Sequence, residues 1–115
     1  MQRGDIYLVD LDPTQGSESN KIRPAVIVSN NAANRTAERN SRGVVTVVPV
    51  TSNTDRVYPF QVLLRSGEGG LTVDSKVRAE QVRSVDYGRL RRKLGTIPPA
   101  SLGRLDDALR THLAL

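Results

Sequence analysis

The sequence predicts a single small α+β domain, mainly β, in which a strongly bent sheet or barrel is closed by a C-terminal helix. Short β-branched runs bounded by polar turns fill most of the chain, as is typical of strands. Leucines recur at helical spacing only after Pro98-Pro99. A length of 115 residues suits one domain, residues 1–115, and is short for two.

Three strands are expected in the first half of the chain. Residues 5–10 are β-rich and stop before an Asp-Pro turn signal. Residues 24–28 and 44–50 are nearly continuous apolar runs, which are typical of strands buried on both faces. The polar segments 14–21 and 30–43 are expected to be loops, the second with at most one helical turn.

The second half begins with less regular strands. Pro59 restricts the predicted strand 57–64 to a sheet edge or a bulge, because proline cannot donate to a ladder. Residues 76–83 alternate and then shift phase, which predicts a bulge. After the basic stretch 89–93, residues 94–97 are expected to form a short last strand.

The C-terminal helix is expected to begin near Pro99, where the missing N–H of proline costs nothing. Asp106 and Arg110 stand at the i,i+4 spacing of a favourable ion pair. The apolar stripe continues to Leu115, so a dimer contact is expected there. Its leucines are Leu102, Leu105, Leu109 and Leu113.

Composition excludes several kinds of site. The chain has no cysteine, hence no disulfide, thiol nucleophile or zinc–thiolate site, and one histidine, His112, which excludes a histidine pair or multi-histidine metal site within one chain. No apolar run approaches the roughly 20 residues that span a membrane, and the first residues do not form a signal peptide, so we expect a soluble, cytoplasmic protein. The net charge of +5, with 14 of 17 basic residues arginine, favours an anionic partner.

The residues that remain suit RNA cleavage without a metal or cofactor. RNA carries its own nucleophile, the 2′-hydroxyl, so a protein need only deprotonate it, stabilise charge on the phosphorus oxygens and protonate the leaving 5′-oxygen. Arg23, where a polar loop enters a buried strand, offers a guanidinium. Thr51 and Ser52 offer hydroxyls at the end of another buried strand. Glu18 is a carboxylate in the preceding loop.

Six short blocks occur in an order and spacing that resemble the MazF/PemK toxins of type II toxin–antitoxin systems. The resemblance extends from Arg3 to Leu113. It depends on the order of all six blocks, because each block by itself is common. The blocks are Arg3-Gly-Asp-Ile-Tyr, Gly16-Ser-Glu18, Arg23-Pro24, Pro49-Val-Thr-Ser52, Glu80-Gln-Val-Arg83 and Leu105-Asp-Asp-Ala-Leu109.

The resemblance implies an SH3-like β-barrel of the CcdB/PemK type that forms a homodimer. It implies a metal-independent, sequence-specific endoribonuclease that cuts single-stranded RNA, leaves 2′,3′-cyclic phosphate and 5′-hydroxyl ends, and is neutralised by an acidic antitoxin whose disordered segment covers the active groove. The family's catalytic arginine and hydroxyl fall on Arg23 and Thr51. Its loop glutamate matches Glu18, and its RNA-proximal glutamine matches Gln81.

Physical chemistry assigns these residues provisional roles. Arg23 would donate to phosphate oxygens and protonate the leaving group, because its high pKa makes it a poor base. Thr51 would stabilise the phosphorane oxygens. Glu18 is a weak candidate for the general base, which stays unassigned. The supporting RNA-binding set is Glu18, Ser52, Asn53, Arg56, Gln81 and Arg83.

Three other readings are open from the sequence. A gyrase poison of the same fold is disfavoured by the absence of tryptophan, and a non-catalytic nucleic-acid-binding barrel would bind RNA without cutting it. A metal nuclease could use only Asp10 and Asp12, which have the character of turn residues. His112 is expected in packing or at a dimer edge, and Tyr58 and Phe60 in the core. The sequence leaves open the RNA motif, the choice among mRNA, tRNA and rRNA, and the antitoxin's identity and stoichiometry.

Overall fold

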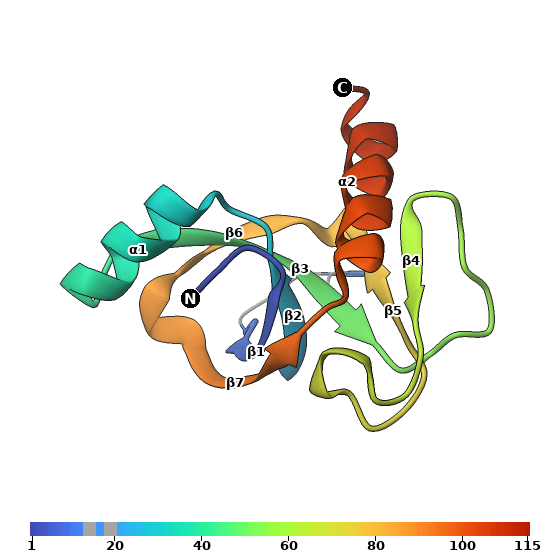
Figure 1. Ribbon diagram of the computed structural model, residues 1–115, viewed down its shortest axis with the longest axis horizontal. Coiled ribbons are helices and arrows are strands. Elements are labelled where there is room, and N and C mark those ends of the chain that lie inside the picture. The colour runs from blue at the N-terminus through green and yellow to red at the C-terminus, as the bar shows by residue number, and fades with distance from the viewer. Residues whose placement is uncertain (13–15, 18–20) are drawn as a thin grey trace.

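The computed structural model describes residues 1–12, 16–17 and 21–115, in which an antiparallel sheet is flanked by two helices (Figure 1). The strand order is β4-β5-β3-β2-β1-β7, and β6 pairs with β3. The helices are α1 (Asn31–Asn40) and α2 (Pro99–Leu113). The strands are β1 (Asp5–Asp10), β2 (Ile22–Ile27), β3 (Val44–Thr51), β4 (Gln61–Leu64), β5 (Ser75–Arg78), β6 (Arg83–Asp86) and β7 (Leu90–Thr96).

The predicted fold class, mainly β with a C-terminal helix, is confirmed. The sheet bends because β3 pairs with β2 and β6 over its first part and with β5 at its end. The strand order ends at β4 on one side and β7 on the other, so the sheet curves like a barrel and stays open within the described residues.

Both faces of the central strands are buried, as their continuous apolar sequences predict. On β2, Val26 belongs to the cluster beneath α2, whereas Ala25 and Ile27 belong to a second cluster that contains Ala37 of α1. The same alternation sends Val48 and Val50 of β3 to the first cluster and Val45 and Val47 to the second. The two helices therefore pack against different clusters on the two faces of the bent sheet. In Figure 1, α1 lies near the start of β3 and α2 lies beside β4 and β5.

Helix α1 corrects the expectation of a loop over residues 30–43. The side chain of Asn30 caps the helix by accepting a hydrogen bond from the amide of Ala33. Asn34 is fully buried, and its amide group donates to the carbonyl of Ser29 and accepts from the Ser29 hydroxyl. Asn34 and Ala37 form the buried side of a helix that is otherwise polar, so its sequence has little apolar periodicity.

The strand expected over residues 57–64 is confirmed only for its second half, β4. Gln61 folds the preceding segment into a turn, since its amide donates to the Tyr58 carbonyl and its side chain accepts from the Tyr58 amide. The expected core position of Tyr58 is wrong, because its side chain is 41% exposed and stacks in parallel on Phe60 at a centroid distance of 5.3 Å. The ring of His112, on α2, lies 6.4 Å from that of Phe60.

The phase shift predicted within residues 76–83 is real but is a 3₁₀ turn over residues 79–81, not a bulge. This turn separates β5 from β6. The last strand is longer than expected, because β7 includes most of the basic stretch before residue 94.

Helix α2 confirms the predicted C-terminal helix and begins at Pro99 as expected. The side chain of Leu105, on this helix, is fully buried against the sheet. The expected pairing of Asp106 with Arg110 is wrong: Asp106 accepts from the guanidinium of Arg3 at 2.6 Å, and Arg110 pairs with Asp107 at 3.0 Å. The Arg3 contact ties the start of the chain to this helix.

Candidate RNA-binding cleft at the ends of β2 and β3

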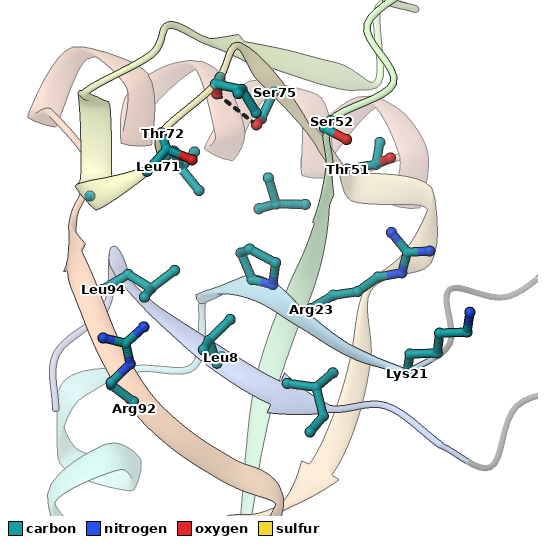
Figure 2. A pocket seen from close by; sticks show the side chains of 15 residues that line it. Leu8, Lys21, Arg23, Thr51, Ser52, Leu71, Thr72, Ser75, Arg92 and Leu94 are labelled. Atoms are coloured by element: carbon teal, nitrogen blue, oxygen red, sulfur yellow. Dashed lines mark hydrogen bonds between the residues drawn. The ribbon is translucent and has the colours of Figure 1, made fainter.

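Antiparallel pairing brings Arg23 and Thr51 to the same edge of the sheet. Arg23 stands at the start of β2 and Thr51 at the end of β3, and these strands pair through Ala25 opposite Pro49. Because the start of one antiparallel strand lies beside the end of its neighbour, two residues far apart in sequence become neighbours. Figure 2 shows the Arg23 guanidinium extending toward Thr51 and Ser52.

The Thr51 hydroxyl already has one structural role. Its Oγ1 accepts a hydrogen bond from the amide of Asn53 at 3.2 Å, which starts the turn after β3. A hydroxyl is both a donor and an acceptor, so the turn uses a lone pair and leaves the O–H available to donate. Asn53 continues the turn by accepting from the amide of Asp55 at 3.1 Å.

These residues line a cleft of about 430 Å³, within the roughly 300–1,000 Å³ typical of ligand pockets. Lys21, Arg23 and Arg92 supply three cations, and no carboxylate occurs among the described lining residues. The potential inside the cleft therefore favours an anion. The lining residues are Leu8, Lys21, Ile22, Arg23, Pro24, Val50, Thr51, Ser52, Gly70, Leu71, Thr72, Val73, Ser75, Arg92 and Leu94 (Figure 2).

Three of the predicted site residues, Arg23, Thr51 and Ser52, thus lie together in one cleft. Glu18, the proposed loop carboxylate, falls outside the described residues. Gln81 reaches toward the same loop, since its side-chain amide lies 3.4 Å from the carbonyl of Ser17.

Arg83, Asn53 and Arg56 do not line the cleft. Arg83 donates to the Leu11 carbonyl at 3.1 Å and so supports the segment that leads into the loop. Arg56 lies over the Tyr58 ring at 5.4 Å and donates to its hydroxyl. The Arg56 backbone is held by Lys76, whose buried ammonium donates to the Arg56 carbonyl at 2.6 Å.

The aspartates considered as metal ligands are used by the fold. Asp10 accepts from the amide of Asp12 at 3.1 Å and forms an ion pair with Arg91 at 3.2 Å. Asp12 accepts from the amide of Lys21 at 2.8 Å. Within residues 1–12, 16–17 and 21–115, no group of three histidine, aspartate or glutamate side chains is placed to hold a metal ion.

The groups with shifted pKa lie away from the cleft. Burial works to raise the pKa of Asp5, but hydrogen bonds from Thr96 and the Gln2 amide, together with the charge of Lys93, lower it overall. Burial, together with the negative charges of Asp5 and Glu38, raises the pKa of Tyr7. Both shifts belong to the packing around β1.

Sequence reasoning missed several lining residues, above all Arg92 and the hydroxyl residues Thr72 and Ser75. Arg92 was visible only as part of a basic stretch, and the register shifts between β1 and β7 mean that simple alternation does not assign its face. Thr72 reaches the cleft from the connection between β4 and β5, and Ser75 from the first position of β5, and no local pattern places either residue there.

Neither helix in the described part of the chain has the length and apolar character required to cross a membrane.

Comparison with known proteins identifies relatives along the whole chain. The family described as "PemK-like, MazF-like toxin of type II toxin-antitoxin system" matches residues 2–113. Endoribonuclease MazF9 of Mycobacterium tuberculosis is 58% identical over 115 residues, covering 100% of this chain and 98% of the relative.

Solved structures agree with this match. MazF from Deinococcus radiodurans superposes with a TM-score of 0.83 at 28% identity, covering 100% of this chain and 97% of that chain. An endoribonuclease from a mycobacterial species, solved in complex with its cognate antitoxin, superposes with a TM-score of 0.78 at 30% identity, covering 100% of this chain and 96% of that one. The chain therefore belongs to the family of PemK-like, MazF-like toxins of type II toxin–antitoxin systems.

Proposed function

We propose that this protein is an endoribonuclease toxin that cuts single-stranded RNA at a short sequence, with no metal or cofactor, and leaves 2′,3′-cyclic phosphate and 5′-hydroxyl ends. The observation that carries the proposal is the convergence of Arg23 and Thr51 in a cleft with three cations and no described carboxylate. Relatives named as endoribonucleases support it.

Arg23 acts on the scissile phosphate. As the 2′-oxygen attacks, a second negative charge develops on the phosphorane, and the guanidinium can donate two parallel hydrogen bonds to its oxygens. These bonds strengthen as the charge grows, so they stabilise the transition state more than the bound substrate. Arg23 also supplies the proton to the leaving 5′-oxygen in this scheme.

Thr51 contributes a donor whose oxygen is positioned before RNA binds. Its Oγ1 accepts a hydrogen bond from the Asn53 amide, so the turn holds the oxygen in place while the O–H donates to a phosphorane oxygen. A donor that needs no reorientation during the reaction is worth more than one that must be ordered. The general base that deprotonates the 2′-hydroxyl is unassigned, with Glu18 as the nearest candidate in sequence.

Sequence preference arises in this proposal from the rest of the supporting set. Single-stranded RNA presents unstacked bases whose edges accept and donate hydrogen bonds. Ser52 is beside Thr51 in the cleft, and Gln81 contacts the loop that precedes Arg23. Asn53 shapes the turn, whereas Arg56 and Arg83 are further away and act through the position of their loops. We take mRNA as the main target, with tRNA and rRNA as alternatives.

The partners follow from the charge of the cleft. An acidic, disordered antitoxin segment would occupy the same cations as RNA and thereby block cleavage, and one structural relative was solved with its cognate antitoxin. A homodimer, formed in the cytoplasm, completes the proposed working unit. Leu113 and Leu115, which are 48% and 85% exposed, supply apolar surface at the end of α2 for such a contact.

The decisive experiment incubates the purified protein with a defined long RNA in excess EDTA. Primer extension maps the cut sites, and direct phosphorylation of the new 5′ ends by polynucleotide kinase identifies 5′-hydroxyls. Cleavage at a recurring short sequence is expected. Cleavage that disappears in EDTA would indicate a metal nuclease instead.

Arg23→Ala tests the assigned residue, with Arg35→Ala as the matched control, because Arg35 is an exposed arginine on α1. Loss of the guanidinium should lower cleavage by at least about 10²-fold, the usual cost of one transition-state donor, while the protein stays folded. The control should cut like the wild type. Folded wild-type protein that binds RNA without cutting it would favour the non-catalytic barrel, and inhibition of gyrase without RNA cleavage would favour the gyrase poison.

A further inference from the structure

Three consecutive basic residues on β7 have different surroundings. Arg91 pairs with Asp10 at 3.2 Å and Lys93 pairs with Asp5 at 3.5 Å. The residue between them lines the cleft together with Leu94, two positions further along the strand. The side chain of this residue, Arg92, has no hydrogen bond or ion pair to any residue that the structure describes.

Arg92 occupies the part of the cleft away from Arg23 and Thr51. In Figure 2 its guanidinium lies on the β7 side of the cleft, while Lys21 and Arg23 lie on the side where β2 begins. Between these cations the floor is apolar. Leu8 of β1 and Pro24 of β2 face each other in register, and Leu94 of β7 extends this floor.

A nucleic acid strand fits this alternation of surfaces. It carries a charge at every phosphate, and apolar bases and riboses between the charges. A phosphate bound to Arg23 at one end therefore places an adjoining nucleotide over the apolar floor. The next cation along the cleft is Arg92, whose planar guanidinium suits a phosphate.

We propose that Arg92 is a substrate-binding residue that holds a phosphate of the same RNA strand beside the scissile one, with the intervening nucleotide lying on Leu8, Pro24 and Leu94. This inference rests on the proposed function, since it takes the phosphate at Arg23 as the scissile one. An acidic peptide is the less favoured occupant, because its charges need not alternate with apolar groups.

The test measures binding rather than cutting. A mixed-sequence, single-stranded RNA 20-mer is made uncleavable by 2′-O-methyl groups, and its affinity is measured by fluorescence anisotropy from low to physiological salt. The variants are Arg92→Gln and, as the matched control, Arg91→Gln. Both remove one charge from adjacent positions on β7, but only Arg92 lines the cleft. Thermal unfolding of both variants checks that they remain folded.

Arg92→Gln is expected to weaken binding about tenfold at low salt. It should also reduce the slope of log affinity against log salt by about 0.7, the value for one phosphate contact on a single strand. Arg91→Gln should change neither quantity as much, because its guanidinium is paired outside the cleft.

An equal loss of RNA affinity in the two variants would overturn the proposal, since it would reflect the change in net charge alone. Unchanged RNA affinity in Arg92→Gln would also overturn it, whether or not the affinity for a polyglutamate peptide falls. A wild-type protein that cuts no RNA would refute the proposed function, and the binding measurement would still decide whether Arg92 contacts a phosphate.

Discussion

Replacing Thr51 by valine separates the two roles of its hydroxyl. Valine keeps the β-branched shape at the end of β3, so packing changes little. It removes the acceptor for the Asn53 amide, which lies 3.2 Å from Oγ1, and the donor proposed for the phosphorane. The first loss affects stability and the second affects the reaction.

The stability cost is small. One hydrogen bond in a partly exposed turn contributes about 0.5–1.5 kcal/mol. A chain of 115 residues has an unfolding entropy near 0.24 kcal/mol/K, from about 2.1 cal/mol/K per residue, so Tm should fall by about 2–6 °C. A domain with a stability of about 5–15 kcal/mol remains almost entirely folded after such a loss. Reduced folding therefore cannot account for a large fall in activity.

Cleavage should fall much further. Losing one oriented donor costs about 10²–10³-fold in kcat, or roughly 3–4 kcal/mol of transition-state stabilisation. Initial rates on a labelled RNA in EDTA and thermal unfolding by circular dichroism measure the two effects separately. Thr51→Ser, which keeps the hydroxyl, should retain most of the cleavage rate and most of the thermal stability. Wild-type cleavage by a Thr51→Val protein with a lowered Tm would refute a catalytic role and leave only the turn.

Two further predictions concern the fold that supports the cleft. Asp5→Asn should lower the free energy of unfolding by about 1–3 kcal/mol at pH 7, because the lowered pKa of this buried carboxyl means that its charged form is stabilised in the folded state. That contribution is present above the unfolded pKa of about 4 and is lost as pH falls through the lower folded value, so denaturant titrations should find a smaller difference at pH 3; an equal difference at both pH values would contradict this assignment. Gly95→Ala should destabilise by about 1–3 kcal/mol, since its Cβ would lie 2.6 Å from the carbonyl carbon of Gly69, which supports one wall of the cleft. Gly103→Ala is the control, because nothing lies within 4 Å of the added Cβ and alanine favours a helix, so the denaturation midpoint of this variant should rise. If Gly95→Ala instead has a midpoint as high as that of the wild type, the close contact between residue 95 and Gly69 can relax.

The segment between β3 and β4 has more structure than its polar sequence implies. Lys76 is buried, and its ammonium donates to the Arg56 carbonyl at 2.6 Å. Arg56 covers the exposed Tyr58, which stacks on the half-buried Phe60. Aromatic residues at alternate positions ordinarily predict a buried strand face. Here Pro59 and the Gln61 turn remove them from the sheet, so only the long-range contact to Lys76 shows how the segment is held.

The sequence by itself determined the elements whose burial pattern is local. The runs of β2 and β3 are nearly continuously apolar because both faces are covered. Helix α2 has leucines at helical spacing because one of its faces packs on the sheet. The order of the short motifs was sufficient to identify the family. Each of these signals depends on residues close together in the chain.

Only the tertiary structure decided which polar residues share the cleft. Thr51 joins Arg23 through strand pairing, and Arg92 joins them from β7, which no pattern of neighbouring residues reveals. The use of Arg91 and Lys93 in ion pairs also depends on aspartates of β1, more than 80 positions earlier in the chain. A charged residue has no periodicity that shows whether its partner is a distant carboxylate or a ligand, so its role becomes visible only when the chain is folded.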